Sequence, residues 1–292
     1  MSTQSQVGQY LRALTMIRDN PFLVEVRWRT RKFLLGRPPM QGTGVPAKPI
    51  SIKGIVLGLL AIVVAFLLWG FYNRLTFPPS VVCFPFLTLV TVLSPLSVYQ
   101  AFAAERERRT WEFLLVSPRS NAEIVLGRVA APIISLLFFT GLALVGVLVL
   151  WLLESLNPTA VSSLPLTRYI ASLSMGFGLG VFLIGLGALI SATSRRALAS
   201  LGISAFLEAL LLVIIPVAIG LLLQGTLSTE EVFYFHPWVG SAVLLQETPS
   251  LASSTVLTTI FAYPAVCLLF FFLFTYLASR VLRHVDQKPT SS

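Results

Sequence analysis

The residues best suited to chemistry in this sequence lie in one short stretch, residues 103–128, which reads AAERERRTWEFLLVSPRSNAEIVLGR. Two acid–base pairs within it have the four-residue spacing that supports a helix, namely Glu105 with Arg109 and Arg108 with Glu112. The other side of that helix carries an apolar patch made of Trp111, Leu114 and Leu115. These side chains offer contact chemistry, because a cleft on another protein could receive the large aromatic group. The alternative interpretation is a helix at the membrane surface whose arginines extend to water.

Catalytic chemistry is poorly supplied by this sequence. It contains no G-x-x-x-x-G-K-[ST], H-E-x-x-H or G-x-S-x-G motif, and its only histidines are His236 and His284. The only cysteines, Cys83 and Cys267, fall in apolar stretches, so we expect neither a disulfide nor a metal site. No cofactor is expected on this chain, and a transport or scaffold component fits it better than an enzyme.

The composition indicates that these residues are positioned by membrane-spanning helices. Of 292 residues, 55% are hydrophobic and 11% are charged, and the mean hydropathy is +0.84. Soluble domains carry about 25% charged residues, so this chain has too little polar surface to cover itself in water. Six apolar stretches reach the ~20 residues needed to cross a bilayer: 54–72, 81–103, 129–153, 169–193, 198–223 and 256–279. Pro85 and Pro95 should kink or break the second stretch.

The basic residues give this arrangement an orientation. Nineteen of the 21 Lys and Arg residues lie in the segments 1–53, 104–128, 194–197 and 280–292, and the alternate loops hold only Arg74 and Arg168. Basic residues concentrate on the cytoplasmic side of membrane proteins. We therefore expect a multi-pass protein of the cell membrane, inner or plasma, with both termini and the 104–128 loop in the cytoplasm. The net charge of +9 then needs no nucleic-acid partner.

Within the cytoplasmic segment 1–53, a helix over 20–35 is expected to lie on the membrane. Asn20 is a good N-cap and Pro21 suits the first helical position. Apolar residues share one stripe of this helix, while the remaining surface is charged and includes Glu25, Arg27 and Arg29. Trp28 is an aromatic residue on that polar side. The basic surface could hold anionic lipid or contact a partner.

Glu208 lies within the fifth apolar stretch, near the expected centre of the bilayer. An intramembrane carboxylate is costly and usually faces the bundle interior or a cavity. It could contact a cationic or polar substrate group, or act as a proton-sensitive gate. The alternative is a protonated or hydrogen-bonded residue that packs against another helix. Pro216 in the same stretch marks an expected kink.

Two further features concern packing and the outer loop. In the fourth stretch, Ser172, Gly176 and Gly180 follow the small-xxx-small pattern, which permits close helix approach within the subunit or between subunits. In the loop 224–255, a short helix could begin at His236, Pro237 and Trp238 and re-enter the membrane from outside. The alternative is an interfacial segment in which Trp238 is an aromatic anchor.

The run Glu-Arg-Glu-Arg-Arg-Thr-Trp-Glu-Phe-Leu-Leu-Val-Ser-Pro at 105–118 resembles the membrane subunit of type-2 ABC exporters. That family typically shows E-R-E-x-x-T-x-E-x-L-L-x-[ST]-P and then an acidic–apolar stretch ending in G-[KR], as Glu123 to Arg128 do. The start of the 20–35 helix is similar to the family's amphipathic interface helix. Trp111 departs from the family, in which many relatives carry a leucine or another aliphatic residue at this position.

The resemblance implies an all-α integral membrane permease with six transmembrane helices over 54–279 and a cytoplasmic tail at 280–292. It also implies a cytoplasmic coupling helix between spans 2 and 3, and re-entrant gate helices between spans 5 and 6. Two separate ATP-binding subunits would hold ATP and Mg²⁺ and dock on the 105–118 helix. A second permease copy, identical or different, would complete a pathway formed largely by spans 1, 2 and 5.

Two other functions stay open at this point. The first is an ion-coupled secondary transporter that uses Glu208, although the sequence halves show no convincing internal repeat. The second is a membrane scaffold that transports nothing. Nothing in the sequence selects a substrate, but the apolar outer loop and the charge-poor spans favour lipid-like or hydrophobic cargo.

Overall fold

The computed structural model of this chain describes residues 79–107, 120–155, 164–214, 216, 236–245 and 253–285. Within these ranges every regular element is a helix, and five helices are long and apolar enough to cross a membrane. The prediction of an all-α, multi-pass membrane protein is confirmed at this level. The expected first span, 54–72, and the expected interface helix, 20–35, lie outside the described residues.

The helices follow the order of the expected spans, with different boundaries. They are α4 (Ser80–Val98), α5 (Ala103–Glu107), α7 (Asn121–Ser155), α8 (Leu166–Thr193), α9 (Ala197–Ala209), the π-helical η1 (Leu210–Ile214), α12 (Pro237–Leu244) and α13 (Ser253–Val285). One candidate span combines α4 and α5, and another combines α9 and η1. The five candidate spans therefore correspond to the second to sixth expected stretches.

Ser120 and Glu123 have the three-residue spacing that predicts a capping box, and this box is present at the start of α7. The N–H of Glu123 donates to Ser120 Oγ at 3.3 Å, and the N–H of Ser120 donates to Glu123 Oε2 at 3.0 Å. Two main-chain donors that the helix leaves free at its start are thereby satisfied. α7 consequently begins at Asn121, well before the apolar stretch 129–153 that predicted it.

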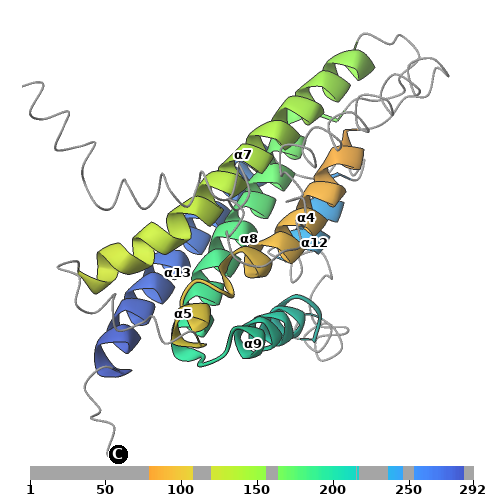
Figure 1. The fold of residues 1–292 in the computed structure, drawn as a ribbon. Coiled ribbons are helices and arrows are strands. Elements are labelled where there is room, and N and C mark those ends of the chain that lie inside the picture. The colour runs from red at the N-terminus through yellow and green to blue at the C-terminus, as the bar shows by residue number, and fades with distance from the viewer. Residues whose placement is uncertain are drawn as a thin grey trace, which may run out of the picture.

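α8 is the central helix of the bundle, and α4, α7, α12 and α13 all pack against it (Figure 1). Most of α8 is buried, whereas only a minority of each other candidate span is. Glycines permit the close approach: a Cβ atom at Gly176 would lie 2.6 Å from Phe86 of α4, and one at Gly180 would lie 2.7 Å from Leu136 of α7. These small residues pack within the chain, which was one of the two interpretations of their spacing.

Regular α-helix is interrupted near two prolines, Pro95 and Pro216. α4 contains Pro85 and Pro95 and ends at Val98, and a turn separates it from α5. The α9 span changes from α-helix to π-helix at Leu210, close to Pro216. Proline has no N–H, so Pro216 cannot donate to the carbonyl four residues earlier, and local π-helix is one way in which a chain adapts to such a gap.

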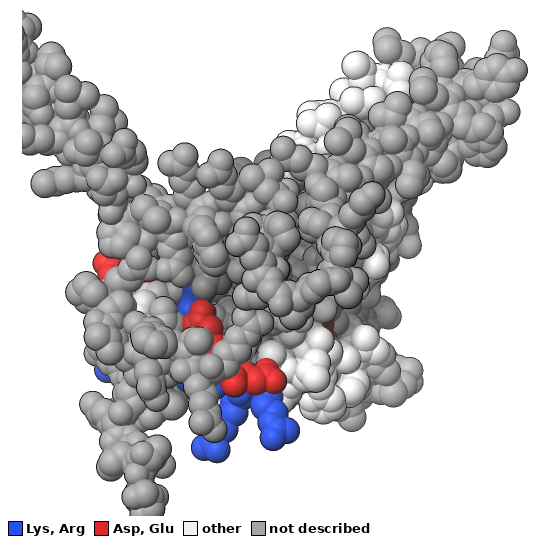
Figure 2. Space-filling model, viewed as in Figure 1, with Lys and Arg blue, Asp and Glu red and all other residues white. Residues whose placement is uncertain are grey.

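Charge is concentrated at one end of the bundle. On the face shown in Figure 2, the charged side chains of the described residues gather where α5 and the start of α9 lie. We call residues 99–107, 120–128 and 191–197 the charged end. The lengths of α7, α9 and α13 instead expose large apolar side chains such as Phe138, Phe206 and Phe261, as helices in contact with lipid do.

Candidate functional site

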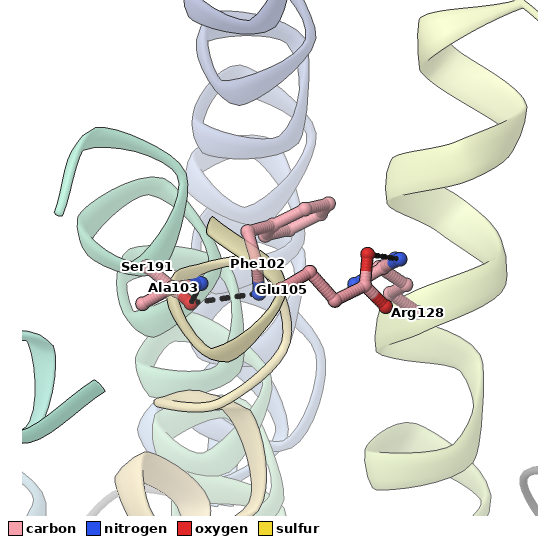
Figure 3. A network of polar contacts seen from close by, with 5 residues as sticks. All are labelled: Phe102, Ala103, Glu105, Arg128 and Ser191. Carbon is pink, nitrogen blue, oxygen red and sulfur yellow. Dashed lines mark hydrogen bonds and ion pairs between the residues drawn. The ribbon is translucent and has the colours of Figure 1, made fainter. Parts of the chain in front are cut away.

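At the charged end, the turn between α4 and α5 is held against α8 by one buried hydroxyl group (Figure 3). The main-chain N–H groups of Phe102 and Ala103 donate to Ser191 Oγ at 3.0 and 3.2 Å. The Ser191 hydroxyl in turn donates to the carbonyl oxygen of Tyr99 at 3.0 Å. One side chain thus satisfies three main-chain groups that the helix break frees, and such groups must find partners in an apolar setting.

An ion pair joins α5 to α7 beside this turn. Arg128 Nη2 contacts Glu105 Oε2, and Arg128 Cζ lies 5.0 Å from the centroid of the Phe102 ring (Figure 3). The side chain of Arg128 is only 1% exposed. A buried guanidinium is costly unless it is paired, so the Glu105 carboxylate and the aromatic face stabilise Arg128 in this position.

α5 is also joined to the junction between α8 and α9. The main-chain N–H of Ala197 donates to Glu107 Oε2 at 3.2 Å, which puts a carboxylate at the positive end of the α9 dipole. Arg106 Nη1 donates to the carbonyl oxygen of Ser194 at 3.4 Å. The short α5 therefore contacts α7, α8 and the start of α9. We call Phe102, Glu105, Arg106, Glu107, Arg128 and Ser191 the junction cluster.

Of the predicted coupling residues, the structure describes only Glu105. The others, Arg109, Trp111, Glu112, Leu114 and Leu115, lie outside the described residues, as do the interface-helix residues Asn20, Pro21, Glu25, Arg27, Trp28 and Arg29. Sequence reasoning missed the bonds of Ser191 and Glu107. Arg128 carried a signal, since it ends the G-[KR] motif, but Ser191 carried none because it is a lone serine near the end of an apolar helix.

A second region of interest is the buried face of α9, which is polar. The four buried residues of this helix are Ala197, Ser200, Ser204 and Glu208, and their spacing puts them on one face. Ser200, Ser204 and Glu208 are 0%, 4% and 9% exposed. Within the described part of the chain, Ser200 Oγ, Ser204 Oγ and Glu208 Oε1 have no hydrogen-bond partner. We call these three residues the polar stripe.

His236, Pro237 and Trp238 begin a short helix, which was one of the two interpretations of this segment. His236 is the N-cap of α12, and its Nδ1 accepts from the N–H of Val239 at 3.4 Å. Its Nε2 donates to the carbonyl oxygen of Leu212 at 2.9 Å. In an α-helix that carbonyl would accept from residue 216, which is a proline without an N–H, so His236 supplies a donor at a position that Pro216 cannot serve.

The two bonds of His236 define its protonation state. Nδ1 accepts and Nε2 donates, so both bonds together require the neutral imidazole with its proton on Nε2. Burial lowers the pKa of His236, an effect that the bond to the Leu212 carbonyl opposes. Neutral imidazole is therefore the form that connects α12 to the end of the α9 span.

α12 runs alongside α8. Near its start, Trp238 packs with Leu212 against a buried cluster of Leu87, Leu179 and Leu183. Near its end, Leu244 packs against Ala171 and Met175 of α8. Since Leu212 follows Glu208 by four residues, α12 begins one helical turn beyond the polar stripe.

No protein-family model and no curated protein matches this chain. Over the parts of the chain that the structure describes, no three His, Cys, Asp or Glu side chains group as metal ligands would. Cys83 and Cys267 are free thiols, and both are buried. The junction cluster, the polar stripe and the start of α12 are therefore the arrangements from which a function can be inferred.

Proposed function

We propose that this chain is the membrane-spanning permease subunit of an ABC-type exporter, driven by separate ATP-binding subunits. The observation that carries the proposal is the junction cluster. The segment that resembles a coupling helix, 105–118, starts within α5. Side chains of α5 contact α7 through Arg128 and the start of α9 through Ala197, and the turn before α5 is bonded to α8 through Ser191.

These contacts would let one docking event move several spans together. A partner that pushed on the coupling segment would displace α5, and the Glu105–Arg128 pair would carry this displacement to α7. The Ser191 and Glu107 bonds would carry it to α8 and α9. Packed helices switch between discrete arrangements more readily than they deform, so a small shift at the charged end can become a change of access within the bundle.

We assign the charged end to the cytoplasm, with both termini, as the distribution of basic residues predicts. α12 is then a re-entrant helix from the outer side, and the bond from His236 to the Leu212 carbonyl closes the pathway outward. Glu208 lies one turn to the inner side of that bond. In this state substrate would reach Glu208 from the cytoplasm or from the inner half of the membrane.

The experiment is to purify the full chain from its native membrane in mild detergent and to identify what remains bound. We expect a subunit with a nucleotide-binding motif to co-purify with the wild type. Trp111→Ala or charge reversal at Glu105 and Glu112 should weaken that association and uncouple ATP hydrolysis from transport. Trp151→Ala, near the far end of α7, is the matched control. Unchanged coupling in the Trp111 and Glu variants would exclude the proposed contact.

One observation favours the ion-coupled alternative. Glu208 is a buried carboxylate in a candidate span, and its Oε1 has no hydrogen-bond partner among the described residues. The alternative differs sharply in what drives transport. Vesicles containing this chain alone would accumulate substrate under an ion gradient, and Glu208→Gln would abolish that uptake. An exporter permease would do neither in the absence of its ATP-binding subunits.

A further inference from the structure

α9 turns its polar side inward and its apolar side outward. Leu198, Ile203 and Phe206 are exposed, whereas the polar stripe of Ser200, Ser204 and Glu208 is buried. We infer that the polar stripe binds the ammonium group of an amphiphilic organic amine. This inference rests on the proposed function, of which it names the substrate class.

The stripe serines do not use the partner that many helical hydroxyls of the described residues use. Thr91, Ser135 and Thr140 each donate to the carbonyl four residues earlier, at 2.8, 2.9 and 2.8 Å. The Ser200 and Ser204 hydroxyls make no hydrogen bond in the described part of the chain. A buried polar group without a partner is destabilising, so a ligand on this face would satisfy groups that the helix itself leaves free.

Glu208 gives the stripe its charge preference. Its side chain is more than nine-tenths buried, and a carboxylate in the middle of a span normally faces a partner or a pathway. Ser204 precedes it by one turn, so both side chains can reach one group bound between them. A primary ammonium offers three donors and one positive charge, which matches one carboxylate and neighbouring hydroxyl oxygens.

The arrangement suits an ammonium better than a metal ion. Hard cations such as Ca²⁺ take about 6–8 oxygen ligands around one point, whereas the stripe is a single row of oxygens along one helix. Ser200 lies two turns from Glu208, so the row extends well beyond the reach of one ion. Among the described residues no cluster of metal-ligating side chains includes Glu208.

The neighbouring apolar cluster indicates what the rest of the ligand is. One turn beyond Glu208, Leu212 packs with Trp238 against Leu87, Leu179 and Leu183. A ligand whose cationic head sits on Glu208 and Ser204 therefore has apolar side chains from four elements, α4, α8, η1 and α12, on its outer side. An amine with a hydrocarbon body would match both parts at once.

The test is direct binding to the full chain in lipid nanodiscs, without any ATP-binding subunit. The probe is radiolabelled dodecylamine, with dodecanol as the uncharged comparison and empty nanodiscs to measure partition into lipid. We expect saturable binding of dodecylamine alone. Glu208→Gln should weaken it roughly tenfold or more, because the ligand charge loses its partner, and Ser204→Ala should weaken it by a smaller factor.

The matched controls are Glu123→Gln, which retains the α7 capping box, and Ser135→Ala, whose hydroxyl only donates within its own helix. Both should bind dodecylamine like the wild type. Equal saturable binding of dodecanol, or unchanged dodecylamine binding by Glu208→Gln, would overturn the inference. So would Glu208-dependent binding of radioactive Na⁺ with no saturable amine binding. Dodecylamine binding is measured without any ATP-binding subunit, so it does not depend on ATPase coupling. Absence of coupling would contradict the proposed function alone, and absence of saturable amine binding would contradict the amine site alone.

Discussion

The carboxylate of Glu107 accepts a hydrogen bond from the main-chain N–H of Ala197, ninety residues later in the chain, at 3.2 Å. A side chain at the end of α5 thereby caps α9, whose own N-cap residue, Arg196, makes no side-chain capping bond. The segment proposed to receive the motor and the helix that carries Glu208 are thus in direct contact.

Replacing Glu107 tests the contact itself. Glu107→Ala should lower the free energy of unfolding by about 1 kcal/mol, as the loss of a helix cap typically does. Glu107→Gln keeps an acceptor oxygen and should recover part of this loss. Thermal unfolding of the detergent-solubilised protein measures both. Identical melting temperatures for wild type and Glu107→Ala would show that the bond contributes no stability.

The Glu105–Arg128 pair should behave as a coupled unit. Glu105→Ala leaves a buried guanidinium without its carboxylate and should destabilise the fold by on the order of 3 kcal/mol. The double variant Glu105→Leu with Arg128→Leu should be less destabilised than either single Leu variant, because it leaves no unpaired charge. A double-mutant cycle measures this coupling. Arg280→Met, at an exposed arginine, is the control, and simple additivity would contradict the prediction.

Two glycines, one in α8 and one in α9, predict opposite effects of an added methyl group. A Cβ atom at Gly185 would lie 3.0 Å from the Cα of Phe271 in α13, so Gly185→Ala should destabilise the protein by about 1–3 kcal/mol through overpacking. A Cβ atom at Gly202 of α9 would meet nothing within 4 Å. Gly202→Ala should therefore be neutral or stabilising. Equal melting temperatures for the two variants would contradict the close packing of α8 against α13 at Gly185.

The effect of replacing His236 on the free energy of unfolding should depend strongly on whether residue 216 is a proline. His236→Ala removes the donor to the Leu212 carbonyl and should cost about 1–3 kcal/mol, the penalty for an unsatisfied buried group. Pro216→Ala restores a main-chain N–H that can donate to that carbonyl. In the Pro216→Ala background, His236→Ala should therefore cost much less. An equal cost in both backgrounds would show that His236 does not replace the missing proline donor.

The same histidine predicts a pH dependence. Burial lowers the pKa of His236 below its ordinary value of 6.5, so the folded state binds fewer protons than the unfolded state at mildly acid pH. The free energy of unfolding should then fall as the pH is lowered through ~6.5 and below. His236→Ala should remove this part of the pH dependence, measured by thermal unfolding, whereas His284→Gln should retain it. A profile that His236→Ala leaves unchanged would contradict the assignment.

Much of the fold could be predicted because its causes are local. Long apolar runs define five of the expected spans, and the Ser120–Glu123 spacing specified the start of α7. Pro95 and Pro216 marked the places near which regular α-helix is interrupted, since a missing N–H acts within one turn. The spacing of Ser172, Gly176 and Gly180 marked a close-packed face, although only the structure identified the helices packed against it.

The parts that escaped prediction depend on which helices meet. Ser191 and Glu107 are ordinary residues in sequence, and their bonds exist only because α5 lies against the ends of α8 and α9. Ser200 and Ser204 were likewise unremarked, since a serine in an apolar helix usually bonds to its own backbone. The bond from His236 to the Leu212 carbonyl could not be predicted either, because it joins two residues 24 positions apart that the fold brings together near Pro216.

The glycine faces of α8 also bear on how the protein is made. Gly178 and Gly185 receive Tyr263 and Phe271 of α13, and Ser174 Oγ donates to the Ile260 carbonyl at 2.7 Å. Of the described helices, α13 leaves the ribosome last. Until it inserts, the most buried helix of the bundle faces lipid with unfilled glycine surfaces and an unpaired hydroxyl. Nascent chains that stop before residue 253 are therefore the ones that membrane proteases should recognise and degrade.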